Sequence, residues 1–304
     1  MYSVIIPAKN EIPHLWYTVH MIRQMWEHHP DEGGEIIVID DGSTDFTQTF
    51  LNDWVIKGFV KSIRTEGVSG PRARQLGAEA ARGDVLFFFD AHILVAHDFF
   101  NKALHTIRNR IWDTVGTVHY PICWNGILMN HAATHYVLTL EKNFWGVNAV
   151  GNFKELTETA GSGHGCFACR RDRFLEVGGY RAPFVEYGGE ETYLNLKMRM
   201  WGYRNYCDPG VYYLHCSTRN QAYHWSNDTF FRNMAMTAYI LGDKDWSDKV
   251  YESHRGPGAN PDVLARLYED AVTSGEEERQ WVRQNARLTL DEVLADLKAR
   301  GVPH

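Results

Sequence analysis

Short apolar runs alternate with amphipathic stretches at the start of the chain. The first run is "YSVIIPA" (residues 2–8), and the stretch after it, "IPHLWYTVHMIRQMWEHH" (residues 12–29), carries apolar residues at helical spacing. A second β-branched run, "EIIVIDD" (residues 35–41), follows. Apolar residues at helical spacing predict an amphipathic helix, whereas short runs rich in Val and Ile predict buried strands. The pattern therefore predicts a β-α-β unit.

The same alternation continues beyond this unit. We expect a helix over residues 43–58, a short strand over 60–65, a helix over 70–83 and the strand "DVLFFFD" over 84–90. Strands this apolar, separated by helices, predict an α/β fold with a mostly parallel sheet that has helices on both faces. In such a sheet, ligands bind beyond the carboxyl ends of the strands.

Polar side chains stand at the ends of three of these strands. They are Asn10 and Glu11 after the first strand, Asp40 and Asp41 at the end of the second, and Asp90 and His92 after the fourth. Any one of them could be a turn residue or a helix cap. Taken together at one edge of the sheet, they favour a ligand site, in which a carboxylate could accept the N–H of a nucleobase.

Asp90 and His92 form an Asp-x-His pair. Side chains alternate along an extended segment, so these two lie on the same side of the chain. A carboxylate oxygen together with an imidazole suits Mn²⁺ or a similar divalent ion that keeps open positions for phosphate oxygens. Two ligands alone do not complete such a site.

Composition and charge limit the classes of protein that are compatible with the chain. With 304 residues, 44% of them apolar, it can bury a large core, and it lacks both a long apolar run and the features of a signal peptide, so we expect a soluble, cytoplasmic protein. The net charge of −7 weakens any nucleic-acid function that relies on a broad basic surface. The odd count of five cysteines argues against a disulfide framework, and we expect Cys166 and Cys169 to be small buried apolar residues.

The C-terminal part of the chain has a different character. "YESHRGPGANPDV", which begins at residue 251, is rich in Gly and Pro and predicts a surface connection. "LTLDEVLADLKARG" then predicts an amphipathic helix with Thr289 as N-cap, Glu292 at the capping-box position and Gly301 at its end. We therefore divide the chain into a domain over residues 1–250 and a helical extension over 251–304, which packs on the domain or forms an oligomer with a partner subunit.

Several motifs together resemble a known family. "SVIIPAKNE", "EIIVIDDGSTD" and "GDVLFFFDAH" resemble the opening of a glycosyltransferase family 2 domain with the GT-A fold, a nucleotide-sugar-binding α/β domain. The sequence is most similar to polypeptide N-acetylgalactosaminyltransferases, whose metal motif is likewise Asp-x-His. "GCFACRRDRFLEVGGY" and "EYGGEETYLNLKMRMWGY" resemble their donor-sugar and acceptor-site motifs. The resemblance implies an enzyme that uses Mn²⁺ or Mg²⁺ to move a sugar from a UDP-sugar to a hydroxyl acceptor.

The resemblance also assigns roles to individual positions. Asp90, His92 and His215 match the metal ligands, and Asp41 matches the aspartate that binds uracil. Arg74 matches an arginine near the diphosphate, and a guanidinium suits that geometry. The implied nucleotide-sugar site consists of Pro7, Ala8, Lys9, Glu11, Asp41, Arg74, Asp90, Ala91, Gly165 and Glu190.

Glu190 and Glu191 match the catalytic position, where the family's two stereochemical classes differ. Inverting family 2 enzymes have Glu-Asp there, and the second acid acts as general base, whereas the retaining aminosugar transferases have Glu-Asn. This chain has Glu-Glu, yet its other motifs resemble the retaining group, so we expect retention. Charge at a helix start is the alternative explanation for either residue.

The sequence does not determine the identity of the donor sugar or of the acceptor. Tyr187 replaces a tryptophan and His164 replaces a glycine of the family motifs, so the donor sugar can differ. The acceptor could be a peptide, a small molecule, a glycan or a hydroxymethylated DNA base. A non-catalytic nucleotide-sugar-binding module is the further alternative, but such a module is expected to lack a metal ligand, and all three candidates are present.

Overall fold

One mixed β-sheet organises the part of the chain that the structure describes. The structure is a computed structural model, and it describes residues 1–28, 33–109, 114–123, 134–139, 145–150, 155–163, 165–217, 226–256 and 259–302. The strands are β1 (Tyr2–Ala8), β2 (Glu35–Asp41), β3 (Lys61–Thr65), β4 (Val85–Phe89), β5 (Ile93–Val95), β6 (Thr114–Cys123), β7 (Thr134–Thr139), β8 (Trp145–Val150), β9 (Thr157–Thr159), β10 (Cys166–Arg170) and β11 (Asn205–Ser217).

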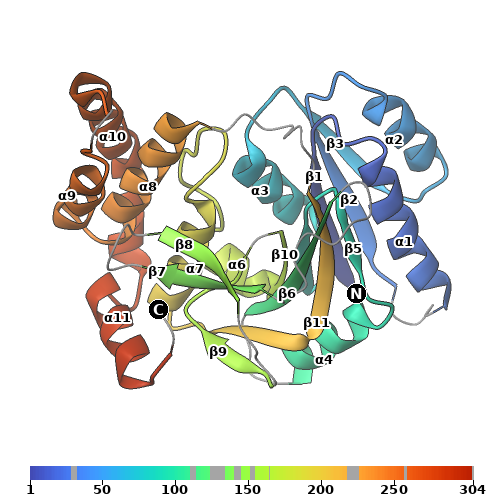
Figure 1. Ribbon diagram of the computed structural model, residues 1–304. Helices are drawn as coiled ribbons and strands as arrows, with labels where there is room; N and C mark the ends of the chain where they lie inside the picture. The colour runs from blue at the N-terminus through green and yellow to red at the C-terminus, as the bar shows by residue number, and fades with distance from the viewer. Residues whose placement is uncertain are drawn as a thin grey trace.

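Helices cover both faces of this sheet (Figure 1). They are α1 (His14–His28), α2 (Thr47–Ile56), α3 (Gly70–Ala80), α4 (Phe99–Asn109), α6 (Arg171–Glu176), α7 (Glu190–Met200), α8 (Asn227–Leu241), α9 (Lys244–Ser253), α10 (Pro261–Asn285) and α11 (Leu290–Ala299). The predicted α/β fold with helices on both faces is confirmed.

The first half of the sheet is parallel, as predicted. In the order β3-β2-β1-β4-β10-β6-β11-β5, β1 pairs in parallel with β2 and β4, and β2 with β3. The second half is mixed: β10 lies antiparallel between β4 and β6, while β11 runs parallel to β6 and antiparallel to β5. This mixed half places the end of β4 beside β10, and the segment after β4 beside β11, although both strands come much later in the chain.

Alternation along the strands creates a separate hydrophobic core on each face. Ile5 of β1 faces one core, which α3, α7, α8, α10 and α11 complete. Its neighbours Val4 and Ile6 face the other core, against α1, α2 and α4. Cys166 and Cys169 are buried and form no disulfide bond, and they belong to opposite cores, so the two thiols cannot share a metal ion. Their prediction as buried apolar residues is confirmed.

The C-terminal helices pack on the same chain. Thr289 and Glu292 form the predicted capping box of α11, and Gly301 follows its end with a φ of +64°. Val293 and Leu297 of α11 lie in the core that also contains Tyr193 of α7. The domain boundary at residue 250 stays a prediction, because this core includes residues from both sides of it. No helix within the described ranges is long and apolar enough to cross a membrane.

Candidate active site

Three potential metal ligands meet beyond the end of β4. Asp90 directly follows β4, and its N–H donates to the Gly165 carbonyl at 2.8 Å. His215 lies on β11, which pairs with β5 next to His92, and the Cys216 N–H donates to the His92 carbonyl at 2.9 Å. Side-chain ligand atoms of Asp90, His92 and His215 all lie within 4.8 Å of one another. The structure thus brings together the three residues that the sequence suggested as ligands.

Asp90 is held as a carboxylate by two positively polarised neighbours. Its Oδ1 accepts a hydrogen bond from Arg74 Nη2 at 2.7 Å, and its Oδ2 lies 3.4 Å from His215 Nε2. Burial by itself would raise the pKa of Asp90, but the hydrogen bond from His215 and the charge of Arg74 outweigh it and lower the pKa to about 2. Asp90 is therefore ionised at neutral pH.

His92 has a carboxylate partner, Glu11. The Nδ1 atom of His92 lies 3.2 Å from Oε1 of Glu11, which is 8% exposed. Burial alone would lower the pKa of His92, but the hydrogen bond with Glu11 and the charge of Asp90 raise it. A carboxylate at Nδ1 favours the tautomer that leaves Nε2 for a metal ion. Glu11, predicted as a nucleotide-sugar contact, thus orients a candidate ligand.

The donor set of this cluster fits a divalent cation. One carboxylate and two imidazoles provide oxygen and nitrogen ligands, which suit Mn²⁺ and related ions. The surrounding protein keeps Asp90 ionised, and the contact with Glu11 orients the His92 ring.

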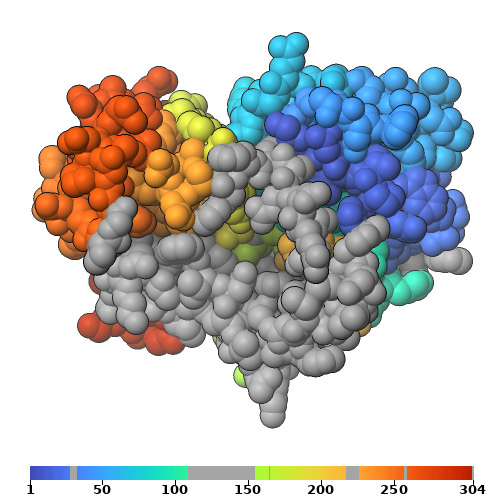
Figure 2. Space-filling model, turned by 45° about the horizontal axis from the view of Figure 1, so that its top comes forward, coloured from blue at the N-terminus to red at the C-terminus, as the bar shows by residue number. Residues whose placement is uncertain are grey.

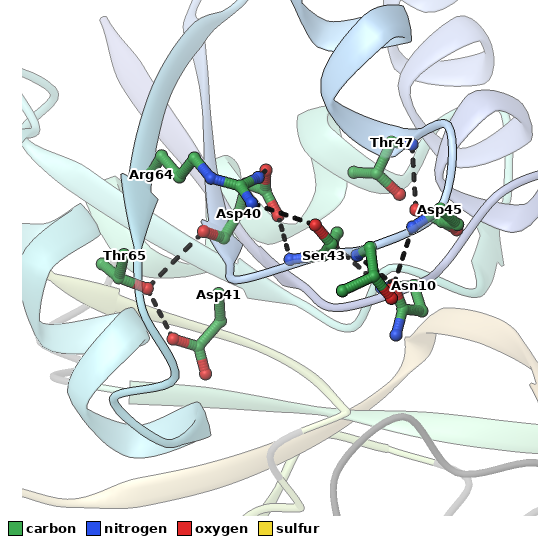
Figure 3. Close-up of polar contacts among 9 residues, drawn as sticks. Asn10, Asp40, Asp41, Ser43, Asp45, Thr47, Arg64 and Thr65 are labelled. Carbon is green, nitrogen blue, oxygen red and sulfur yellow. Dashed lines mark hydrogen bonds and ion pairs between the residues drawn. The ribbon is translucent and has the colours of Figure 1, made fainter.

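Two adjacent aspartates at the end of β2 have different surroundings (Figure 3). Asp40 forms an ion pair with Arg64 and accepts a hydrogen bond from the Ser43 N–H at 2.9 Å. Asp41 Oδ1 accepts hydrogen bonds from Thr65 Oγ1 at 2.5 Å and Val68 N at 2.6 Å. Asp41 Oδ2 is buried without a hydrogen-bond partner. A buried carboxylate oxygen without a hydrogen bond costs free energy, and a ligand that donates to it would remove that cost. Asp41 has such an oxygen, whereas both oxygens of Asp40 already have partners.

Hydrogen bonds join the loop after β1 to the loop after β2. Asn10, with a φ of +55°, accepts hydrogen bonds at Oδ1 from the N–H groups of Thr44 and Asp45 at 2.7 and 3.2 Å. The Asn10 N–H donates to Ser43 Oγ at 2.9 Å (Figure 3). Asn10 therefore has a structural role: it fixes the edge on which Asp41 lies.

The remaining nucleotide-sugar candidates lie along the same edge. Pro7 and Ala8 are buried at the end of β1, and the Ala91 carbonyl accepts a hydrogen bond from the Thr18 hydroxyl at 2.9 Å. Lys9 reaches toward the turn beside Asp41, since a Cβ on Gly67 would be 3.8 Å from its Nζ.

Gly165 is packed too tightly to carry a side chain. A Cβ at this position would lie 2.7 Å from the Tyr213 hydroxyl and 3.4 Å from Asp90 Oδ2. The glycine therefore keeps space beside the metal-ligand cluster. His164, the neighbouring position that departs from the family motif, lies outside the described residues.

Glu190 and Glu191 begin α7 and differ in accessibility. Glu190 is 1% exposed, its Oε2 accepts a hydrogen bond from the Gly188 N–H at 2.8 Å, and burial raises its pKa. Glu191 is only partly buried, and its charge raises the pKa of Tyr187 well above the usual value. Both carboxylates interact electrostatically with Arg74. The acid pair therefore lies near the metal-ligand cluster, with Glu191 the more accessible member.

Comparison with known proteins decides the family. The sequence model "Glycosyl transferase family 2" matches residues 3–178. The chain belongs to glycosyl transferase family 2. Because the matched region includes Asp41, Arg74, Asp90 and His92, most of the site described above lies within the family domain.

Curated relatives of this family 2 chain include animal enzymes. It is 31% identical to N-acetylgalactosaminyltransferase 7 of Drosophila melanogaster over 244 residues, which cover 73% of this chain and 39% of the relative. It is also 31% identical to the inactive polypeptide N-acetylgalactosaminyltransferase-like protein 5 of Macaca fascicularis over 218 residues, 66% of this chain and 48% of the relative. The chain thus spans less than half the length of these two relatives.

Solved structures confirm the GT-A fold of this family 2 chain. GalNAc-T7, solved with UDP, GalNAc and Mn²⁺, matches with a TM-score of 0.68 at 21% identity, over 89% of this chain and 55% of that one. Residues 1–349 of TarS from S. aureus, solved with UDP-GlcNAc, match with a TM-score of 0.57 at 14% identity, over 99% of this chain and 92% of that one.

Two contacts in the family 2 site could not be predicted from the sequence. Tyr213 lies beside Gly165 only because β11 returns to the sheet next to β5, a pairing that local patterns do not encode. Glu11 was singled out by its position, but its contact with His92 depends on how the chain turns between β1 and α1. Both features arise from packing between distant segments.

Proposed function

We propose that the protein is a metal-dependent glycosyltransferase that transfers a sugar from a UDP-sugar donor to a hydroxyl group. The observation that carries this proposal is the convergence of Asp90, His92 and His215 within 4.8 Å. The first two of these residues lie inside the region that matches the family 2 model. Related structures solved with UDP and Mn²⁺ or with UDP-GlcNAc support the choice of donor and metal.

The metal ligands and Arg74 would act on the donor diphosphate. A Mn²⁺ or Mg²⁺ ion held by Asp90, His92 and His215 would offset the negative charge that develops on the departing nucleoside diphosphate. Arg74 is only 6% exposed and is oriented by Asp90, so it is preorganised to donate to a phosphate oxygen.

Asp41 would recognise the base. Its free Oδ2 is an acceptor that the N3–H of uracil can satisfy, whereas cytosine has no N–H at that position. Lys9 extends to the neighbouring turn and adds positive charge near the nucleotide. These contacts favour a uridine nucleotide as the donor carrier.

The non-catalytic alternative is the competing proposal, and it has a precedent in the inactive macaque relative. The intact metal-ligand set and the ionised state of Asp90 favour catalysis instead. A DNA-modifying glycosyltransferase would keep the same chemistry with a different acceptor.

A donor and acceptor panel tests the proposed function. The native protein is incubated with UDP-, GDP- and CDP-sugars and with peptide, glycan, small-molecule and hydroxymethylated DNA acceptors, in Mn²⁺ or in chelator. Mass spectrometry is expected to detect a sugar-sized mass increase with a UDP-sugar and Mn²⁺ only. Donor hydrolysis is measured in parallel, because it reports activation of the donor in the absence of the right acceptor. Binding of UDP and Mn²⁺ with neither transfer nor hydrolysis would instead support the non-catalytic module.

We further propose that transfer retains the anomeric configuration of the donor. In retention without an enzymatic base, the leaving phosphate takes the proton of the acceptor, so Glu191→Gln is expected to lower turnover less than about tenfold. If Glu191 were the general base, Glu191→Gln would instead lower turnover on the order of a hundredfold or more. Proton NMR of the product is expected to show an α-linkage from an α-linked donor. A β-linked product, together with a large loss in Glu191→Gln, would establish inversion with Glu191 as base.

A further inference from the structure

A buried ion pair joins the C-terminal extension to the helix that begins with Glu190. Lys197 of α7 is 0% exposed and Glu278 of α10 is 4% exposed, with 2.5 Å between Lys197 Nζ and Glu278 Oε1. The Tyr193 hydroxyl also donates to Oε1 at 2.5 Å, and Arg181 Nε lies 2.9 Å from Oε2. Trp281 covers the pair, with its ring 4.9 Å from Lys197 Nζ. These contacts join α10 to α7 and to the segment that follows α6, which contains Arg181.

Hydrogen bonds continue from this pair to the candidate active site. Lys197 Nζ donates to the Gly179 carbonyl at 3.3 Å, and the next N–H, that of Tyr180, donates to Gln75 Oε1 at 2.8 Å. Gln75 follows Arg74 on α3, and Arg74 donates to Asp90 at 2.7 Å. The turn over residues 178–180 therefore lies between the C-terminal extension and the helix that carries Arg74.

This turn fits closely against α3. Gly179 has a φ of +52°, and a Cβ there would lie 2.2 Å from Gln75 Oε1 and 2.5 Å from a Phe174 ring atom. Close packing of this kind transmits displacement, because neither side can move without the other. A shift of the turn would therefore also shift α3.

Stability alone does not account for this ion pair. Burial lowers the pKa of Lys197 to about 8, although Glu278 opposes the shift, so the buried ammonium carries a desolvation cost. Replacing such a pair by well-packed neutral residues is often neutral or stabilising. What the pair supplies that an apolar contact cannot is a directed hydrogen bond to the Gly179 carbonyl.

We propose that Glu278 and Lys197 are positioning residues for sugar transfer, through which α10 fixes the 178–180 turn and α7 and thereby keeps Arg74 and Glu190 in place. This inference rests on the proposed glycosyltransferase function. It gives the C-terminal extension a role in the reaction, although none of its residues needs to touch the substrate. Loss of the pair therefore affects turnover more than donor binding.

The double variant Lys197→Met/Glu278→Gln tests the inference. It leaves no uncompensated buried charge, so its melting temperature is expected to stay within a few degrees of the native value. Its kcat is expected to fall about tenfold to a hundredfold with the donor KM little changed, because misplacement of reacting groups costs rate. Hydrogen exchange of amides in residues 178–191 is expected to be about tenfold faster or more, with exchange in α1 unchanged. The single variants, which leave one buried charge unbalanced, are expected to be less stable than the double variant.

Leu297→Ala is the matched control. Leu297 is fully buried in the same core, and its apolar side chain takes no part in the ion pair. This variant therefore loses stability and is expected to keep native kcat below its melting transition. Native kcat or native exchange rates in the double variant would overturn the inference. If the native protein itself transfers no sugar and hydrolyses no donor, the proposed function fails, and the exchange rates alone then decide the inference.

Discussion

Replacing His92 with alanine is expected to lower sugar transfer on the order of a thousandfold or more, because the metal-ligand cluster loses one of its three side chains. Mn²⁺ raises the melting temperature of a protein only if it binds the folded state more tightly than the unfolded state. Mn²⁺ should therefore raise the melting temperature of the native protein and not that of His92→Ala. Without metal, we expect the variant to melt within a few degrees of the native protein, since the loss is chiefly one hydrogen bond to Glu11.

An exposed histidine provides the control for this experiment. His20 lies on the solvent side of α1, and His20→Ala should keep both the activity and the Mn²⁺-dependent rise in melting temperature. Full activity of His92→Ala in chelator would exclude the proposed role of the cluster.

Asp41→Asn is expected to change base specificity as well as affinity. The asparagine oxygen can still accept from Thr65 and Val68, so the loop keeps its hydrogen bonds. Its amide, however, places a donor where Asp41 Oδ2 offers an acceptor. That donor opposes the N3–H of uracil and matches the N3 acceptor of cytosine. Calorimetry in Mn²⁺ should therefore show native preference for UDP over CDP, and the variant should reduce that ratio about a hundredfold.

A matched substitution separates this effect from a general loss of charge. Asp53→Asn removes the same charge from an exposed position on α2, and it should leave the ratio of UDP to CDP affinity unchanged. An unchanged ratio in Asp41→Asn, or equal native affinity for UDP and GDP, would contradict uracil recognition by Asp41.

The parallel half of the fold was predictable because its signals are local. Val- and Ile-rich runs such as the one in β2 alternate with amphipathic segments, and the structure confirms each of these elements between residues 2 and 89. The mixed half was not predicted from hydrophobic pattern. The position of β10 between β4 and β6, and the return of β11 to β5, depend on pairing between strands far apart in the chain.

The candidate site divides in the same way. Asp90 and His92 could be paired from their spacing alone, whereas His215 was suggested only by resemblance to a family. Asp40 and Asp41 are neighbours at one strand end, and the sequence does not say which one has a free acceptor. Their side chains point to opposite sides of β2, so Arg64 neutralises Asp40 while Asp41 keeps one oxygen unsatisfied.

The pairing of β11 with β5 also determines when the three candidate metal ligands come together during synthesis. Asp41, Asp90 and His92 all leave the ribosome long before His215, which lies on β11, the last strand along the chain in the residues that the structure describes. An emerging chain that has completed only β1 to β5 contains two of the three ligand residues. Its Arg74–Asp90 and Glu11–His92 contacts involve only residues that have already been synthesised. If the proposed metal site is correct, an ion that needs all three ligands would therefore bind only after the sheet has closed, and it could not template the first half of the domain.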